Sequence, residues 1–155
     1  MAKSGVVDRD LGWKDIKKEL KKLKKMGVKA GIVEGHHISN NGANIAEYAL
    51  YNEVGTDNGH IPARPFIRSW VDNNKEQINR TMDSAYNHVV KGKWTAEDAM
   101  KRIGEFAQSG IRDNIIRGDF EPNKPATIKK KGSDKPLIDI GTMRKAIRYE
   151  VVKKK

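Results

Sequence analysis

Two long segments with helical periodicity follow one another almost without a break, and they limit the fold more than any other feature. Over residues 65–92 apolar side chains recur every three or four positions, which predicts one helix of about 25 residues and about 40 Å. Thr95 and Asp98 have the spacing of a capping box, so we expect a second helix to begin there and run to Gly118. Because only a short turn joins the segments, they should lie antiparallel as a helical hairpin, and Gly110 predicts a close crossing. The apolar positions are Phe66, Ile67, Trp70, Val71, Ile78, Met82, Ala85 and Val89, then Met100, Ile103, Phe106, Ala107, Gly110, Ile111 and Ile115.

Two shorter segments have the composition of strands. Residues 28–33 (VKAGIV) and residues 148–152 (RYEVV) are natural antiparallel partners. The expected fold class is therefore α+β: a small antiparallel sheet packed against the long antiparallel helical hairpin, with an extended loop and a C-terminal arm. At 155 residues we expect one domain, in which residues 1–10 form a flexible arm, 119–141 a surface arm and 153–155 a basic tail.

A constrained loop precedes the hairpin. Asn44 is a good N-cap for a helix that should end near Val54, where Gly55 can leave the helix with a positive φ. Turn-forming residues follow at 57–59, and two prolines then restrict the backbone. The tip nevertheless carries apolar groups, so the loop is either a corner buried in its own subunit or a docking surface. These groups are Ile61, Pro62 and Phe66.

The composition excludes several classes of protein. A hydrophobic fraction of 37% beside 33% charged residues predicts a folded chain with a small core. The absence of cysteine rules out disulfides and thiolate chemistry and fits synthesis in the cytoplasm. Because no apolar run approaches about 18 residues and the chain does not begin with a signal-peptide core, we expect neither a membrane span nor export.

The formal net charge of +11 is most concentrated in the first predicted helix, which begins near Trp13. Its apolar stripe consists of Trp13, Ile16, Leu20 and Leu23, and lysines occupy the opposite face. Such a face is either simply solvated or a contact surface for DNA phosphates or an acidic partner. The candidate DNA-facing residues are Lys17, Lys18, Lys21, Lys22, Lys24 and Lys25.

The sequence contains none of the familiar enzyme signatures. There is no phosphate-binding loop, nucleophile elbow or metal-ligand spacing, and the four histidines are too scattered to suggest a metal site. Glu53, Asp57 and Asp139 could in principle gather as in a metal-dependent nuclease, but no paired-acid motif supports this. A helix-turn-helix is also disfavoured, since its turn is only three to four residues long. We therefore expect no enzymatic activity and no cofactor.

Two sequence blocks together resemble the tail-completion, or head–tail joining, proteins of tailed bacteriophages and prophages. The first contains Ile45-Ala46, then YNEVGT at residues 51–56 and IPARPFIR at residues 61–68. The second contains Ile111-Arg112, PATI at 125–128, KGSD at 131–134, PLID at 136–139, Gly141 and Met143. One departure is Ile140, where this family would be expected to have threonine.

The resemblance implies a structural virion protein without enzymatic activity, made in the host cytoplasm. It implies a ring, expected to be a hexamer, that completes the tail and joins it to the head connector around the DNA channel. Partners would be further copies of the chain, other neck and tail proteins and, non-specifically, packaged DNA, but no membrane. A basic DNA-binding module remains an alternative, and a tail terminator or head-side stopper is a nearer one. The implied assembly surfaces are the loop and the arm, with Asn52, Glu53, Gly55, Thr56, Ile61, Pro62, Arg64, Pro65, Phe66, Pro125, Thr127, Leu137, Ile138 and Asp139.

Overall fold

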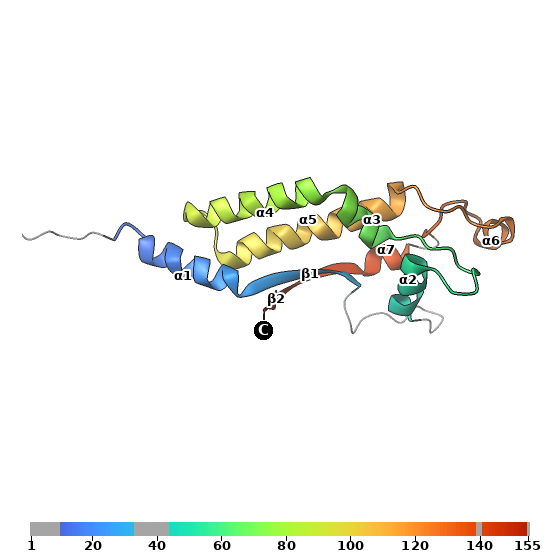
Figure 1. Ribbon diagram of the computed structural model, residues 1–155, viewed down its shortest axis with the longest axis horizontal. Helices are drawn as coiled ribbons and strands as arrows, with labels where there is room; N and C mark the ends of the chain where they lie inside the picture. Colours follow the sequence, from blue (N-terminus) through green and yellow to red (C-terminus); the bar gives the residue numbers. More distant parts are fainter. Residues whose placement is uncertain (1–9, 33–43, 139–140, 155) are drawn as a thin grey trace, which may run out of the picture.

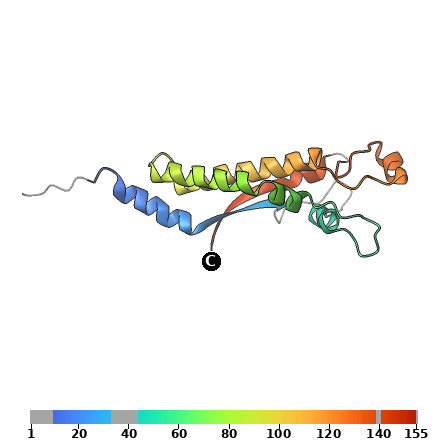
Figure 2. The same ribbon diagram turned by 45° about the horizontal axis from the view of Figure 1, so that its top comes forward.

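A computed structural model describes residues 10–32, 44–138 and 141–154 of the chain. The fold is α+β and elongated, with α1 at one end and α6 at the other (Figures 1 and 2). In chain order the elements are α1 (Trp13–Lys24), β1 (Met26–Ile32), α2 (Ile45–Val54), α3 (Phe66–Asn73), α4 (Lys75–Val90), α5 (Ala96–Arg117), α6 (Pro125–Lys131), α7 (Thr142–Ala146) and β2 (Ile147–Lys153).

The 22-residue helix α5 lies in the middle of the structure. Helix α4 runs along one side of it, as the predicted helical hairpin requires, and the two-stranded sheet runs along another side (Figure 1). The strands are antiparallel, from the pair Met26 and Lys153 to the pair Ile32 and Ile147. This confirms the predicted pairing for residues 28–32, while Val33 lies outside the described residues. Since Lys153 still pairs in the sheet, β2 includes the first residue of the expected basic tail.

The apolar interior has two parts. The larger cluster joins α2, α3, α5, α7 and β2, and Phe66, Ile111 and Ile147 are its most deeply buried large side chains. The smaller cluster lies between α4 and α5 around Ala85 and Val89, and the partly buried side chains of α1 pack against it. Together the clusters cover one face of every long helix. Packing of such a face provides most of the stability of a helix in a protein.

The prediction of one continuous helix over residues 65–92 is wrong. The helix is interrupted at Asn74, which has φ −121° and ψ 18° and separates α3 from α4. The Asn74 side chain donates to the backbone oxygen of Trp70 (2.8 Å), a local bond of the kind by which asparagine competes with regular helix. Val71 and Met82, both placed on the predicted apolar stripe, are 39% and 49% exposed, whereas Ala85 and Val89 farther along α4 are buried.

The predicted second helix is confirmed, including its start. Thr95 and Asp98 form the capping box, in which the Thr95 hydroxyl accepts from the Asp98 backbone N–H and the Asp98 carboxylate accepts from the Thr95 N–H (both 3.1 Å). Two such bonds satisfy backbone donors that a helix start otherwise leaves unpaired. The other predicted cap is also present, because the Asn44 side chain accepts from the Ala46 N–H at 3.0 Å.

Two glycines allow close packing on α5. A Cβ atom added at Gly110 would collide with the indole of Trp70, and one added at Gly104 would collide with the ring of Tyr149. The predicted close crossing at Gly110 is therefore confirmed, and Gly104 provides a second one on the side of the sheet. Each missing side chain is replaced by an aromatic ring lying directly on the helix backbone.

We predict that Gly110→Ala and Gly104→Ala each lower the free energy of unfolding by about 1–3 kcal/mol, because the added methyl group overpacks a filled site. The sign is diagnostic, since alanine at an unobstructed helix position would stabilise by up to about 1 kcal/mol. Ser109→Ala, at an exposed neighbouring position of α5, is the control and should stay within about 0.5 kcal/mol of the wild type. Denaturant unfolding measures all three, and a stabilised Gly110→Ala would contradict the packing described.

Candidate assembly surface

The loop after α2 folds back tightly onto the end of that helix. Gly55 has φ 78°, and a Cβ there would lie 3.0 Å from the Ala63 backbone nitrogen, so the position requires glycine. The Thr56 N–H donates to the Ile61 oxygen (3.0 Å), and the Ile61 N–H donates to the Thr56 hydroxyl (3.0 Å). Asn58 closes the tip by accepting from the Thr56 hydroxyl at 2.8 Å. The loop is thus held mainly by its own backbone and short polar side chains.

Helix α2 and helix α3 are joined through Glu53. Its two carboxylate oxygens accept from the backbone N–H groups of Ile67 and Arg68, both at 2.9 Å. These donors belong to the first turn of α3, where an acidic group is favoured by the helix dipole. Both carboxylate oxygens of Glu53 are therefore used to cap α3.

Arg64 is the most unusual residue of the corner, because it is a cation with only 6% exposure. Its guanidinium donates to the backbone oxygens of Glu121 (2.6 Å) and Pro122 (3.1 Å) and to Oδ1 of Asn123 (3.3 Å). Burial lowers the pKa of Arg64 from its ordinary value, but an arginine remains charged in a protein. Three oxygens at the start of the C-terminal arm thus accept hydrogen bonds from the charged guanidinium, and these bonds join the loop to the arm.

Asn123 closes the arm into a hook. It is buried, and its Nδ2 donates to the Lys135 oxygen at 3.1 Å and, more weakly, to the Asp134 oxygen at 3.4 Å. The beginning and the end of the arm therefore meet beside Arg64, and α6 lies at the far end of the hook (Figure 1). Both predicted assembly segments, which are distant in sequence, form one continuous part of the structure.

The predicted assembly residues divide according to their burial. Asn52, Arg64, Phe66 and Leu137 are at most 6% exposed, so the expectation that they contact a neighbour is corrected: they support the corner from inside the subunit. For Phe66 this is the alternative that the sequence left open. Glu53, Gly55, Thr56, Ile61, Pro62, Pro65 and Ile138 are half-buried, Pro125 and Thr127 are exposed, and Asp139 lies outside the described residues.

The most apolar exposed surface of this region was not predicted. It is the outer face of α2, formed by Tyr48, Leu50, Tyr51 and Val54, whose side chains are 43%, 56%, 40% and 52% exposed. The opposite side of α2 carries Ile45 and Ala49 into the core. The sequence signal for this surface was that α2 carries apolar residues on both of its sides. Such a helix can pack one side on its own core and the other against a partner.

A second exposed apolar set lies on α3 and α4. It consists of Val71, Met82 and Tyr86, which are 39%, 49% and 50% exposed. Met82 and Tyr86 are one helical turn apart and share a face of α4. Helix α4 lies along α5 and away from α2 (Figure 1), so Met82 and Tyr86 are separate from the α2 outer face, whereas Val71 lies on α3, which contacts α2.

The six candidate DNA-facing lysines, Lys17, Lys18, Lys21, Lys22, Lys24 and Lys25, are all exposed, as expected of a solvated face. Trp13, which the apolar periodicity placed in the core, is instead 56% exposed. The ammonium group of Lys17 lies 5.6 Å from the centroid of the Trp13 ring, within the range of a cation–π contact. The apolar side of α1 is therefore formed by its later residues, which pack on α4 and α5.

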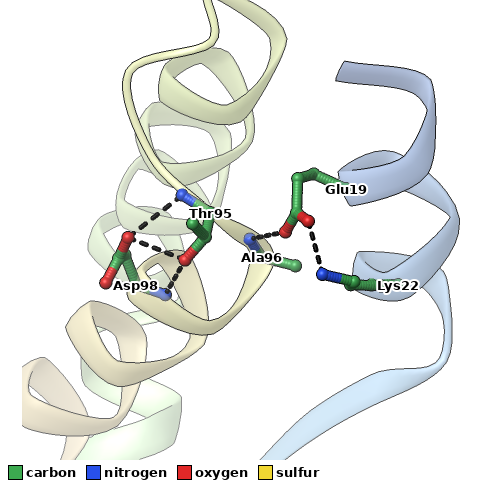
Figure 3. A network of polar contacts seen from close by, with 5 residues as sticks. All are labelled: Glu19, Lys22, Thr95, Ala96 and Asp98. Carbon is green, nitrogen blue, oxygen red and sulfur yellow. Dashed lines mark hydrogen bonds and ion pairs between the residues drawn. The ribbon is translucent and has the colours of Figure 1, made fainter. Parts of the chain in front are cut away.

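Glu19 fixes the position of α1. One of its carboxylate oxygens accepts from the backbone N–H of Ala96 (2.8 Å), the first residue of α5, and the other forms an ion pair with Lys22 at 2.5 Å (Figure 3). The hydrogen bonds from Lys22 and Ala96 lower the pKa of Glu19 below its ordinary value of 4.5. The capping box of α5 and the tether of α1 thus meet at one helix start (Figure 3).

Metal binding and membrane spanning find no support in the described part of the chain. Residues 10–32, 44–138 and 141–154 contain no group of three or more potential metal-ligating side chains and no helix long and apolar enough to cross a membrane. The imidazole of His88 stacks on Trp94 with 4.2 Å between the ring centroids, and its Nδ1 lies 2.7 Å from the Ser84 oxygen. His36 and His37 lie outside the described residues.

We predict that Arg64→Ala lowers the free energy of unfolding by about 2–4 kcal/mol, because it leaves the side-chain oxygen of buried Asn123 and two backbone oxygens without this donor. Arg64→Lys should recover only part of this loss, since an ammonium group cannot reproduce the fork of the guanidinium. Limited proteolysis should also cut the arm faster in both variants. Arg68→Ala, an exposed change nearby, is the control; equal behaviour of Arg64→Ala and Arg68→Ala would show that Arg64 does not hold the arm.

We predict that the attachment of α1 weakens in acid. Because the folded-state pKa of Glu19 is lowered, its stabilising effect is complete above about pH 4.5 and is lost as the pH falls through the lowered pKa. Hydrogen exchange of α1 peptides should therefore be faster in Glu19→Gln than in the wild type at neutral pH, with the difference shrinking in acid. Glu97→Gln, which removes an exposed carboxylate paired with Lys101 on α5, should leave α1 exchange unchanged.

Comparisons of this chain with protein-family models, with curated proteins and with solved structures find no match.

Proposed function

We propose that this protein is a structural subunit of a tailed-bacteriophage neck, which forms a ring that completes the tail and joins it to the head connector around the DNA channel. The proposal starts from the two sequence blocks that resemble tail-completion proteins, at residues 45–68 and 111–143. In this role the chain is a virion component with no catalytic function and no cofactor. Its partners are other copies of itself, with six as the expected number, and the adjoining neck and tail proteins.

The observation that carries the proposal is the presence of two separate apolar surfaces on an elongated subunit. One is the α2 outer face, and the other is the face of α4 that carries Met82 and Tyr86. Large exposed apolar side chains gathered in this way usually mark contacts with another protein. If the two different surfaces meet between neighbouring subunits, the contact is heterologous, and a heterologous contact closes into a ring when its rotation permits.

The rigid corner supports the same role. The α2 outer face is held at a fixed angle, because Glu53 joins α2 to α3 and Arg64 joins the loop to the arm. A preorganised surface loses less conformational entropy when it binds. Pro125 and Thr127 on the exposed hook remain available for a neighbouring subunit or for the next protein of the neck.

We predict that the wild type assembles into a ring. The average mass measured by light scattering should therefore exceed that of the monomer and should rise with protein concentration. Leu50→Glu with Val54→Glu should abolish this assembly, because two charges in the centre of an apolar contact would be buried without partners. Both positions are exposed, so the melting temperature should change little.

Ser84→Glu with Ser109→Glu adds the same charge at exposed positions of α4 and α5, away from both apolar surfaces, and should assemble normally. Normal rings from the Leu50→Glu/Val54→Glu variant would rule out the α2 outer face as the contact. A wild type that stays monomeric at every concentration would contradict self-assembly into a ring.

The neighbouring alternatives, a tail terminator and a head-side stopper, differ in what the ring caps. Electron microscopy of rings mixed with purified tails and with purified DNA-filled heads separates them. Tail completion and tail termination require density at the head-proximal end of the tail, whereas a stopper requires density at the portal vertex of the head.

A further inference from the structure

A basic surface at one end of the molecule has a role that the apolar surfaces do not explain. Residues 13–25 contain seven lysines against two acidic residues, so this stretch contributes +5 of the net charge of +11. The fold adds two lysines from the end of the chain. Lys154, which follows β2, donates its backbone N–H to the Lys25 oxygen (2.7 Å), and Lys153 lies beside Lys22 and Lys25. Lys91 and Lys93 in the turn between α4 and α5 lie instead on the flank of α1 that carries Asp15 and Glu19. The basic surface thus consists of Lys14, Lys17, Lys18, Lys21, Lys22, Lys24 and Lys25, with Lys153 and Lys154 at its end.

The charge on this surface is poorly compensated. Lys14 pairs with Asp10, and Lys22 pairs with Glu19. Within the described residues the other lysines of α1 form no salt bridge. Glu19 itself points toward α5, where it accepts from Ala96, so it lies at the edge of the basic surface (Figure 3).

The lysines have a regular arrangement. At 3.6 residues per turn the seven side chains occupy about 160° of the helix circumference, and Lys14, Lys18, Lys21 and Lys25 form a row about 16 Å long. A shallow hollow of about 520 Å³ beside this row is lined only by Lys14, Lys17, Lys18, Lys21, Lys22 and Lys25. A duplex of the same length carries about ten phosphates, so a row of lysines can meet those on its near side.

Helix α1, which carries the row of lysines, is already fixed in the free subunit. The apolar side chains Leu20 and Leu23 pack on the cluster between α4 and α5, and Glu19 binds the start of α5. Helix α1 lies at one end of the elongated molecule (Figures 1 and 2), and its lysines are exposed within the part of the chain that the structure describes. A helix whose backbone is already fixed loses less entropy on binding than one that must first be ordered.

We propose that this surface binds double-stranded DNA through its phosphate backbone, without reading the base sequence. A single strand would be bound by stacking on several aromatic side chains, whereas Trp13 is the one aromatic residue of α1. A membrane-surface helix needs a free apolar face, but the apolar face of α1 is already packed on α4 and α5. The proposal is independent of ring formation, because it uses neither the α2 outer face nor the second apolar surface.

The test is fluorescence anisotropy with a labelled random-sequence duplex of about 30 base pairs between about 50 and 200 mM salt. We expect affinity to fall steeply with salt, with a slope of log K against log salt near −0.9 for each phosphate neutralised. In the full chain carrying Lys17→Gln, Lys18→Gln, Lys21→Gln and Lys25→Gln, the affinity at low salt should drop by at least about tenfold and the slope should flatten by up to about 3.6.

The matched control carries Lys124→Gln, Lys129→Gln, Lys130→Gln and Lys135→Gln, which remove the same charge from the hook at the opposite end. It should keep the wild-type slope, because charges so far apart are screened from one another. Equal loss in both variants would show that net charge alone is responsible and would overturn the proposal.

Other polyanions are tested in parallel. Tighter binding to a single strand of the same length, to phosphatidylserine vesicles or to polyglutamate than to the duplex would also overturn the proposal. The Leu50→Glu/Val54→Glu variant should bind the duplex as a monomer if the basic face acts alone. Its failure to bind would show that DNA binding requires the assembled ring, contrary to the independence proposed.

Discussion

The contact of Trp70 and Tyr149 with the backbone of α5 is the constraint on which the rest of the structure depends. Gly110 and Gly104 remove the side chains that would hold the aromatic rings away from the helix. Helix α3 and strand β2 can then approach α5 closely, and close packing multiplies small dispersion contacts into substantial stability. One helix therefore serves as a common support for α3, α4 and the sheet, which explains how a chain with a small core remains ordered over an elongated shape.

At one end of α5 this support extends into a rigid corner made largely of polar bonds. The Asn114 side chain donates to the Phe66 oxygen (2.7 Å) and so holds the start of α3 against α5. From there Glu53 positions α2, and Arg64 positions the arm. A buried guanidinium bonded to carbonyl oxygens is favourable only when all its partners are in place, so the corner is expected to form or open as a unit.

Helices α1 and α2 lie toward opposite ends of the molecule (Figure 1), and their exposed surfaces differ in chemistry, so each suits a different partner. Around α2 the exposed side chains are apolar and suit a protein neighbour, whereas around α1 they are basic and suit phosphate. In a ring subunit of a DNA-conducting neck both would be used at once, the apolar faces between subunits and the basic face toward nucleic acid. The mutations proposed for each end leave the other end unchanged, so the two functions can be measured separately.

The sequence by itself determined the class of fold and most of the secondary structure, apart from the break at Asn74, because these depend on local signals. The capping box at Thr95, the glycine at the end of α2 and the strand segments at 28–32 and 148–152 act through neighbouring residues or simple alternation. Only the tertiary structure decided which apolar residues are covered: Phe66 is buried, while Val71 and Met82, on the same predicted stripe, are exposed. The burial of a helix face depends on which element packs against it, and periodicity along one segment does not identify that element. The bond from Arg64 to the arm likewise joins residues 57 positions apart in sequence, so no local pattern predicts it.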